Sequence, residues 1–281
     1  MRTVSTISEM QAISEAYRME GKRIAFVPTM GFLHEGHLSL MEQGREKADI
    51  LVASIFVNPA QFGPNEDLDT YPRAMESDLQ KCEDVGVDIV FTPTKDQIYP
   101  DGYETYVQLE KLPDHLCGLS RPVFFKGITT VVTKLFNIVK PHVAVFGEKD
   151  FQQLAIIRRM VKDLNMEIEV LGGALVREKD GLAMSSRNAY LTEAQREEGL
   201  RLYQSLCKAK EMVKKGETDP KAIEKMTQEH INKAPEAKID YISICDPDTL
   251  DEVDTISGPT LMALAVMMGK TRLIDNMMLR R

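Results

Sequence analysis

The 281-residue chain contains no tryptophan, four cysteines and five histidines. The cysteines (Cys82, Cys117, Cys207 and Cys245) are widely separated and form no CxxC pair, and the histidines form no cluster at metal-ligand spacing. This pattern argues against a disulfide framework and against a zinc site. We therefore expect reduced thiols in a cytosolic protein.

An excess of basic residues and a long hydrophobic run are also missing. Lysine and arginine number 35 against 43 acidic residues, which gives a net charge of −8 and an isoelectric point near 5.3. Nucleic acids and anionic membranes reward a basic face, so neither is expected as the main partner. The longest apolar run, residues 261–268, is far too short to span a bilayer, and the N-terminus lacks the apolar core of a signal peptide. We expect a soluble cytoplasmic protein that acts on small molecules, with no nucleic acid and no membrane as partner.

Strands and helices alternate over the first part of the chain, as in a parallel sheet. The run at residues 50–57 is nearly continuous and rich in β-branched residues, which is typical of a strand covered on both faces. Residues 103–109 alternate and predict an edge strand, whereas residues 58–72 and 113–126 resemble loops. The other predicted strands are residues 24–27, 87–92 and 142–146, and the predicted helices are residues 8–20, 38–47, 73–85, 128–139 and 150–164.

The composition changes after Gly172 and Gly173, where we place a domain boundary. Two charged amphipathic helices are expected at residues 191–215 and 221–232, the second with Asp219 and Pro220 at its start. Three strands are then expected at residues 239–245, 261–268 and 271–279. The second part is therefore a small α+β domain.

The most informative stretch is residues 28–37, which follow the first long strand and lead into a helix. His34 and His37 would share one face of the first helical turn, where N–H groups and the helix dipole favour an anion such as a phosphate. Gly31 and Gly36 would let a ligand approach the main chain closely. The alternative is that the glycines only shape a turn and the histidines only cap or pack.

Two later stretches carry further polar groups suited to phosphate. Residues 147–153 follow a predicted strand and contain Lys149, which can meet a phosphate as a point charge. Residues 182–188 combine Ser185, Ser186 and Arg187, whose hydroxyl and guanidinium donors suit a triphosphate or a pyrophosphate leaving group. Taken alone, the first is more often a solvated helix cap and the second an ordinary surface loop.

Together, the His-x-Gly-His turn and the Met-Ser-Ser-Arg loop resemble the paired signatures of the nucleotidyltransferase superfamily that includes class I aminoacyl-tRNA synthetases. The resemblance is closest to the pantothenate synthetase (pantoate–β-alanine ligase) family and runs nearly end to end. It rests on residues 28–31, 34–37, 56–59, 61–67, 71–73, 134–137, 147–153, 184–188 and 272–276.

The resemblance implies an enzyme that condenses (R)-pantoate with β-alanine, using ATP and Mg²⁺, through a pantoyl-adenylate intermediate. It also implies a Rossmann-like α/β domain, with a parallel sheet between helices, over residues 1–176, and a smaller α+β lid domain over residues 177–281. A homodimer is the expected assembly.

Site residues follow from the same resemblance. The catalytic set is His37, His34, Lys149 and Arg187, with His37 as the proton donor. Gln61 and Gln153 would clamp pantoate, and Asn58 lies where β-alanine enters. The ATP-binding set is Met30, Gly31, Phe32, Leu33, His34, Glu35, Gly36, His37, Gly147, Glu148, Lys149, Asp150, Val176, Met184, Ser185, Ser186 and Arg187.

Some features stay open at this point. Phe124 stands where the family commonly has a histidine, after Arg121 and Pro122. Asp67, Asp69 and Asp78 could approach Mg²⁺, but scattered acidic residues are mostly solvated, and no protein metal ligand is assigned. The remaining histidines (His115, His142 and His230) are expected to be structural or exposed.

Two other functions are weighed against the ligase. A nucleotidyltransferase acting on a phosphorylated acceptor would fit the His-x-Gly-His turn alone, but such an acceptor calls for cations rather than the amides of Gln61 and Gln153. A non-catalytic nucleotide-binding protein is suggested only by Phe124.

Overall fold

The computed structural model describes residues 1–64 and 66–280. Asn65, part of the 61–67 stretch on which the resemblance rests, lies outside the described residues. The chain forms two compact units. Unit 1 comprises Met1–Glu110, Arg121–Glu148 and Ile156–Ala174, and unit 2 comprises Lys111–Ser120, Lys149–Ala155 and Leu175–Arg281. The expected division at residue 176, with a lid beyond it, stays a prediction.

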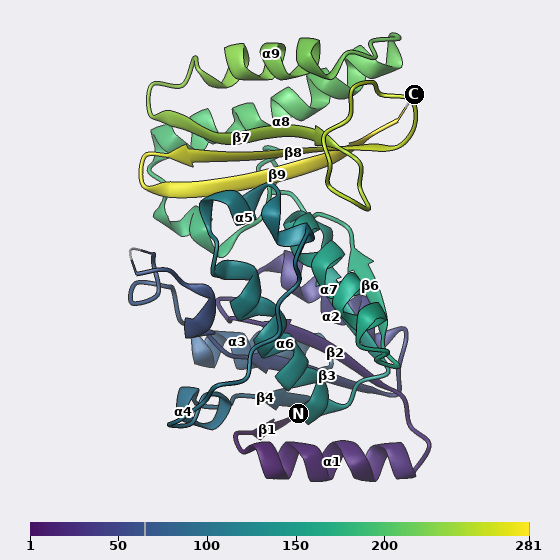
Figure 1. Cartoon of the computed structure of the whole chain (residues 1–281). Helices are drawn as coiled ribbons and strands as arrows, with labels where there is room; N and C mark the ends of the chain where they lie inside the picture. Colours follow the sequence, from purple (N-terminus) through teal and green to yellow (C-terminus); the bar gives the residue numbers. More distant parts are fainter. Residues whose placement is uncertain (65, 281) are drawn as a thin grey trace. The chain divides into compact units, whose positions relative to one another are not determined.

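Unit 1 is built on a six-stranded sheet in which all pairings are parallel. The spatial order is β1-β4-β3-β2-β5-β6, and Figure 1 shows β1, β4, β3 and β2 following one another from the bottom upward. Every residue of β3 is buried, as its apolar sequence predicts for a central strand. The predicted parallel α/β sheet is confirmed. Its strands are β1 (Arg2–Val4), β2 (Ile24–Thr29), β3 (Ile50–Ile55), β4 (Ile89–Phe91), β5 (Val143–Gly147) and β6 (Glu169–Gly173).

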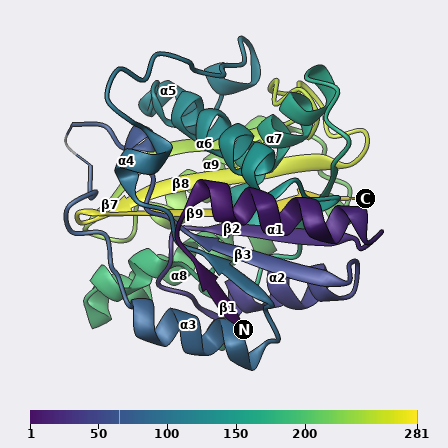
Figure 2. The same cartoon turned by 90° about the horizontal axis from the view of Figure 1, so that it is seen from below.

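Helices cover both faces of this sheet. Figure 2 shows α1 and α6 on one face and α2 and α3 on the other. Alternate residues of β2 serve the two faces: Phe26 contacts Phe136 of α6 edge to face, whereas Val27 belongs to the apolar cluster that includes Met41 of α2 and Cys82 of α3. The bounds are α1 (Ile7–Met19), α2 (Glu35–Arg45), α3 (Met75–Asp84), α4 (Lys95–Ile98), α6 (Phe124–Val139) and α7 (Phe151–Asp163), with short 3₁₀ turns η1 (Pro59–Gln61) and η3 (Glu148–Asp150).

Three predictions of local structure are wrong in unit 1. Residues 103–109 form no strand. The Thr129 hydroxyl of α6 donates to the Val107 carbonyl, and the Thr130 hydroxyl accepts the Val107 N–H, so side chains of a helix take the place of a neighbouring strand. Helix α6 begins at Phe124 rather than at residue 128. The edge strands β1 and β6 are missing from the prediction, since β1 has three residues and β6 is polar at its start and glycine-rich at its end.

Unit 2 contains an antiparallel sheet of three strands, β7 (Ala237–Cys245), β8 (Thr260–Met268) and β9 (Thr271–Leu279). Helices α8 (Glu193–Lys214) and α9 (Pro220–Ile231) lie on one side of it (Figure 1), where their apolar faces meet alternate residues of β8 such as Leu264 and Val266. As predicted, Asp219 caps α9 with Pro220 at its first position. Short segments of the same unit, η2 (Leu112–Asp114), α5 (Cys117–Ser120) and η4 (Ser186–Tyr190), complete the description.

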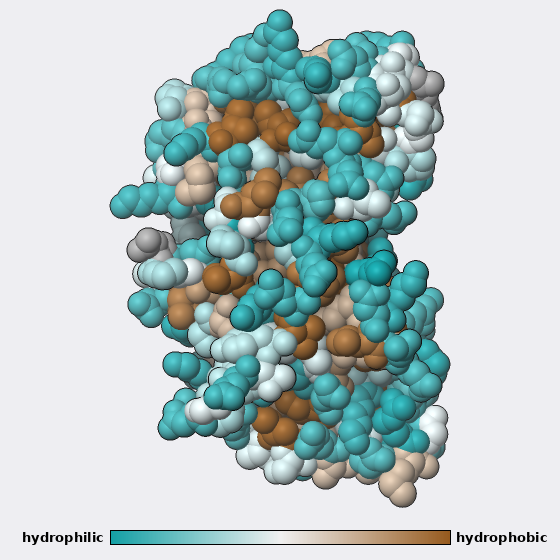
Figure 3. Space-filling model, in the orientation of Figure 1, coloured by the Kyte–Doolittle hydropathy of each residue, from teal (hydrophilic) through white to brown (hydrophobic). Residues whose placement is uncertain are grey.

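The surface is mainly hydrophilic on the face drawn in Figure 3, and its apolar residues lie in separate patches. No helix of the described residues is long and apolar enough to cross a membrane.

His142 joins two strands of the unit 1 sheet. Its Nδ1 accepts a hydrogen bond from the main-chain N–H of Ile24 at 3.0 Å, at the start of β2. Burial, followed by the charges of Arg18 and Arg23, lowers the pKa of His142 below its ordinary value of 6.5. The fold therefore holds His142 neutral, as an acceptor.

This lowered pKa predicts a contribution to stability that depends on pH. The folded state binds a proton at His142 less readily than the unfolded state, so the contribution is present above pH 6.5 and is lost as the pH falls below it. We expect His142→Asn, which keeps an acceptor for Ile24 and cannot titrate, to flatten the dependence of the free energy of unfolding on pH over that range. Urea unfolding of both proteins across a pH series measures this, and parallel curves for the two would contradict it.

Candidate active site

The strand order of unit 1 points to one edge of the sheet. From β2 the chain moves outward through β3 to β4, and it later returns to the other side of β2 to form β5 and β6. The order therefore reverses between β2 and β5, and ligands of open α/β sheets bind at the carboxyl ends of the strands at such a point. The turn at residues 30–34 follows β2, and Glu148 follows β5.

The turn after β2 has an unusual main-chain path. Gly31 has φ 82° and Phe32 has φ 51°, so two consecutive residues are left-handed. A Cβ on Gly31 would lie 3.0 Å from Asp78 Oδ2 and 3.0 Å from Ile55 Cγ2, so a side chain there would be both crowded and strained by the positive φ. Phe32 is held in a conformation that non-glycine residues rarely adopt, and such strain concentrates at functional sites.

Asp78 of α3 holds this turn in place. Its side chain is 1% exposed, and its two oxygens accept the main-chain N–H groups of Phe32 at 2.8 Å and Leu33 at 2.7 Å. One helical turn later, Lys81 Nζ donates to the carbonyl of Leu33 at 2.6 Å. The expectation that Asp78 is solvated is wrong, because the side chain is buried and both carboxylate oxygens bond the main chain.

His34 and His37 lie together at the start of α2. His34 is the N-cap residue, and the two ring centroids are 4.1 Å apart. The main-chain N–H of His34 donates to His37 Nδ1 at 3.3 Å, so a neutral His37 carries its proton on Nε2. The pair therefore offers an N–H donor beside the first N–H groups of a helix, an arrangement suited to an anion.

Two buried amides lie beyond the end of β3. Asn58 is 1% exposed and Gln61 is 8% exposed. Asn58 Nδ2 donates to Gln61 Oε1 at 3.0 Å, and Gln61 Nε2 contacts Met30 Sδ at 3.2 Å. The structure thus brings the predicted substrate residues Asn58 and Gln61 next to the start of the predicted ATP-binding turn.

Arg121 braces the segment that follows Gln61. Its guanidinium donates to both carboxylate oxygens of Glu66 at 2.6 Å and to the main-chain carbonyl of Gln61 at 3.3 Å. It also stacks 3.6 Å from the ring centroid of Phe124. Phe124 therefore supplies a planar ring for a cation–π contact at the position where the resemblance predicts a histidine.

The predicted site residues at the end of β5 and directly after it are divided between the two units. Gly147 and Glu148 belong to unit 1, whereas Lys149, Asp150 and Gln153 belong to unit 2. Lys149 Nζ is 3.6 Å from Asp150 Oδ2, and the Lys149 carbonyl accepts from Asn276 Nδ2 at 2.9 Å. Gln152 is buried and bonds three main-chain groups of residues 112–117, whereas the adjacent Gln153 is only half-buried. Gln152 thus has a structural role, which leaves Gln153 as the substrate-binding candidate.

The second unit also orders the Met-Ser-Ser-Arg loop. The Val176 carbonyl accepts the Met184 N–H at 3.0 Å, and Ser185 Oγ accepts the Arg187 N–H at 3.3 Å as the cap of η4. Asn188 Nδ2 then donates to Glu178 Oε1 at 2.7 Å. Val176 and residues 184–187 therefore form one local group, and their place in the ATP-binding set stays a prediction.

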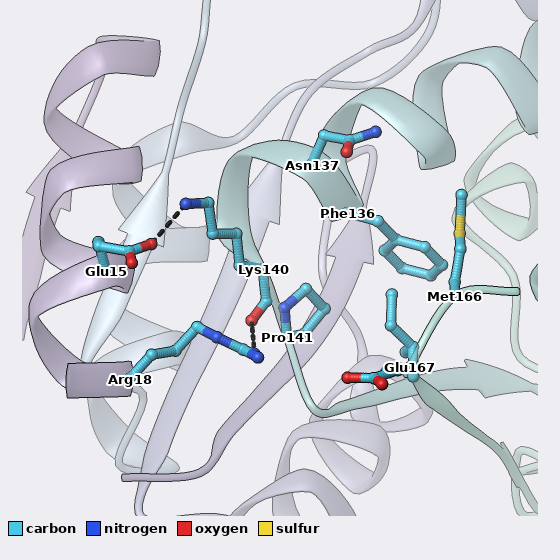
Figure 4. A pocket seen from close by; sticks show the side chains of 9 residues that line it. Glu15, Arg18, Phe136, Asn137, Lys140, Pro141, Met166 and Glu167 are labelled. Atoms are coloured by element: carbon cyan, nitrogen blue, oxygen red, sulfur yellow. Dashed lines mark hydrogen bonds and ion pairs between the residues drawn. The ribbon is translucent and has the colours of Figure 1, made fainter. Parts of the chain in front are cut away.

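A surface hollow of about 310 Å³ lies elsewhere on unit 1, at the amino ends of β5 and β6 (Figure 4). Arg18 donates to the Lys140 carbonyl at its rim, and Lys140 pairs with Glu15. Its position, at the edge opposite the carboxyl ends of the strands, separates it from the predicted site residues of unit 1.

The described residues contain no group of three or more His, Cys, Asp or Glu side chains able to hold a metal ion. A magnesium site built by protein ligands alone does not fit this donor set.

Comparisons with known proteins identify the family of this chain. The model of the family Pantoate-beta-alanine ligase matches residues 2–278. Pantothenate synthetase from Desulfatibacillum aliphaticivorans is 62% identical over 279 residues, which is 99% of each chain. The chain belongs to the pantoate-beta-alanine ligase family.

Solved structures of this family share the fold. Pantothenate synthetase from Thermus thermophilus superposes with a TM-score of 0.93 at 42% identity, covering 99% of both chains. The ligase from Francisella tularensis, whose structure contains β,γ-ATP and β-alanine, gives a TM-score of 0.82 at 35% identity, over 99% of this chain and 97% of that one. The chain thus has the whole fold of a pantoate-beta-alanine ligase.

Two supporting residues were not predicted from the sequence. Asp78 holds the turn after β2, and Tyr99 holds Asn58, because its hydroxyl donates to Asn58 Oδ1 at 2.8 Å. A signal existed for Asp78. It lies four residues before the buried Cys82, so a carboxylate occupies the apolar face of α3. No local pattern marks Tyr99.

Replacing one carboxylate oxygen of Asp78 tests the role of this side chain in holding the turn at residues 30–34. Asp78→Asn replaces an acceptor with an NH₂ group that faces a main-chain N–H, so we expect a loss of about 1–3 kcal/mol in the free energy of unfolding and a fall in turnover. Asp84→Asn, on the exposed side of the same helix, is the matched control. Equal unfolding free energies for the two variants would contradict the role of Asp78.

Gly127 predicts a second effect on the site. A Cβ there would lie 2.2 Å from the Ala60 carbonyl oxygen and 2.6 Å from the Gln61 nitrogen, so Gly127→Ala must displace η1 or α6. We expect a cost of about 1–3 kcal/mol in stability, together with weaker substrate binding. Gly258→Ala, with nothing within 4 Å of the added atom, is the control. Thermal unfolding of both variants measures the difference, and a tolerated Gly127→Ala would show that the contact is not rigid.

Proposed function

We propose that this chain joins (R)-pantoate to β-alanine at the expense of ATP, forming pantothenate, AMP and pyrophosphate through pantoyl-adenylate. The observation that carries the proposal is the family match over residues 2–278, together with a His34–His37 pair at a helix start that closely follows Met30, which the Gln61 amide contacts. The F. tularensis relative holds both an ATP analogue and β-alanine, which supports ATP and β-alanine as substrates here.

The reaction has two steps. A pantoate carboxylate oxygen attacks the α-phosphorus of ATP and expels pyrophosphate, which leaves a mixed anhydride. The amine of β-alanine then attacks the acyl carbon, and AMP departs with that pantoate oxygen. The first step brings like charges together, so it needs donors on the phosphates, whereas pantoate must be bound without neutralising its attacking carboxylate.

The residues proposed for these tasks follow the same division. His37, through Nε2–H, donates to the phosphates and to the departing pyrophosphate, with His34 beside it, and Lys149 and Arg187 supply positive charge. Gln61 and Gln153 bind pantoate as uncharged donors, and Asn58 contributes to the β-alanine side. The proposed ATP-binding set adds Met30, Gly31, Phe32, Leu33, Glu35, Gly36, Gly147, Glu148, Asp150, Val176, Met184, Ser185 and Ser186 to the four catalytic residues.

Magnesium, assembly and location complete the proposal. We propose that Mg²⁺ enters with ATP and is held mainly by phosphate oxygens, because the described residues offer no cluster of protein ligands. We also propose that residues 177–281 act as a lid that keeps water from the mixed anhydride. The protein is proposed to be a cytoplasmic homodimer.

The decisive test of the activity is its dependence on substrates. We expect AMP and pyrophosphate to form from ATP only when pantoate and β-alanine are both supplied for steady turnover, and chromatography of the nucleotides measures this. Steady release of ADP would overturn the proposal.

The proposed proton donor predicts a kinetic effect. We expect His37→Ala to lower the rate of pantoate-dependent ATP–pyrophosphate exchange by a factor of about 10²–10⁴, since a general acid contributes that much. His230→Ala, on α9, should exchange at the wild-type rate. Exchange by His37→Ala at the rate of the control would remove His37 from the mechanism.

A further inference from the structure

The carboxamide of Asn58 has only one possible orientation. Its Oδ1 accepts the main-chain N–H of Ala60 at 3.3 Å, and its Nδ2 donates to the main-chain carbonyl of Gly127 at 3.1 Å. A main-chain N–H can only donate and a main-chain carbonyl can only accept. These two groups therefore assign the oxygen and the nitrogen of Asn58 without reference to any other side chain.

The orientation of Gln61 follows from that of Asn58. Asn58 Nδ2 is a donor, so the Gln61 atom 3.0 Å from it must be the oxygen Oε1. The Gln61 nitrogen then lies on the opposite side, where it contacts Met30 Sδ at 3.2 Å. An amide nitrogen carries two hydrogens, and thioether sulfur is a weak acceptor. Gln61 thus presents N–H donors, which match a carboxylate or hydroxyl oxygen of a substrate.

Tyr99 completes this chain of bonds. Its hydroxyl donates to Asn58 Oδ1 at 2.8 Å, the shortest of the four contacts of the Asn58 carboxamide. Burial raises the pKa of Tyr99, so the phenol stays protonated and remains a donor. The direction of every bond from Tyr99 through Asn58 to Gln61 is therefore the same, and such chains reinforce one another.

The Tyr99 ring is itself held by neighbours. The centroid of Tyr103 lies 5.1 Å away in an edge-to-face arrangement, and Lys134 Nζ lies 4.3 Å from the Tyr103 centroid and 5.9 Å from that of Tyr99. These contacts fix the ring, and with it the hydroxyl, at the wall of the Asn58 site.

We propose that Tyr99 is a positioning residue for pantoate: its hydroxyl fixes the Asn58 carboxamide, which in turn holds Gln61 with its N–H groups toward the substrate. This inference rests on the proposed function and deepens it. Tyr99 touches neither substrate nor the reacting atoms in this account, so its loss acts on pantoate binding and leaves ATP binding unchanged.

Tyr99→Phe and Tyr103→Phe form a matched pair for the test. Both variants remove one phenol oxygen from the same aromatic stack, but only Tyr99 bonds Asn58. We expect Tyr99→Phe to raise the KM for pantoate by about two- to tenfold, the value of one hydrogen bond, with the KM for ATP within about twofold of wild type. Tyr103→Phe should have the wild-type KM for pantoate and the wild-type KM for ATP.

A double-mutant cycle separates positioning from general stability. If Tyr99 acts through Gln61, the effect of Tyr99→Phe on kcat/KM for pantoate disappears when Gln61 is already alanine. Because kcat/KM is measurable below saturation, weak binding by Gln61→Ala does not prevent the comparison. A thermal unfolding midpoint for Tyr99→Phe close to that of Tyr103→Phe is expected alongside.

Three results would overturn the inference. These are equal pantoate KM values for the two Phe variants, a rise in the KM for ATP of Tyr99→Phe as large as its rise in the KM for pantoate, or full additivity of Tyr99→Phe and Gln61→Ala in kcat/KM for pantoate. Each requires a wild-type enzyme that forms AMP from ATP, pantoate and β-alanine. If the wild type forms no AMP, the proposed function itself is wrong. If the wild type forms AMP and one of the three results is found, only the inference is wrong.

Discussion

One buried carboxylate sets the geometry on which the active edge of unit 1 depends. Asp78 accepts the N–H groups of Phe32 and Leu33, which follow Gly31 in a turn with two consecutive positive φ values. The turn cannot relax without leaving that carboxylate buried and unsatisfied, a costly outcome. The start of α2 at His34 is consequently fixed relative to the end of β2 and to α3. The donors proposed for the phosphates are thus oriented before substrate arrives, which is the condition for electrostatic catalysis.

Charge is distributed around this edge in a way that suits a carboxylate nucleophile. In unit 1, Arg121 is committed to Glu66 in a bidentate pair and stacks on Phe124. The neighbouring side chains of Asn58 and Gln61 are amides, and Asn58 is fixed by main-chain groups and by a phenol. A carboxylate bound by amides keeps its nucleophilic charge, whereas an ion pair with a guanidinium would weaken it. The Phe124 substitution fits this scheme, because the ring supports Arg121 without adding a titrating group.

Prediction from sequence succeeded where the signal is local and failed where contacts join distant residues. The central strands β2, β3 and β5 follow from apolar runs, and the helix after β2 follows from apolar spacing, although it begins at Glu35 rather than at residue 38. Strand order could not be predicted, since the short strand β1 pairs with β4 far along the chain, as Thr3 pairs with Val90. The bonds from Asp78 to Phe32 and from Tyr99 to Asn58 join residues 46 and 41 positions apart and have no periodic signature. The period-two pattern of residues 103–109 misled because threonines of α6, rather than a strand, bond its main chain.

The central claim is that the pantoate carboxylate attacks the α-phosphorus of ATP at this edge of the sheet. The most direct measurement uses pantoate labelled with ¹⁸O in its carboxylate, with mass spectrometry of the products after complete turnover. Attack on the α-phosphorus transfers one labelled oxygen from pantoate to AMP, because the acyl–oxygen bond is the one that β-alanine breaks. The account predicts singly labelled AMP and unlabelled pyrophosphate. Unlabelled AMP, or label in inorganic phosphate accompanied by ADP, would contradict it.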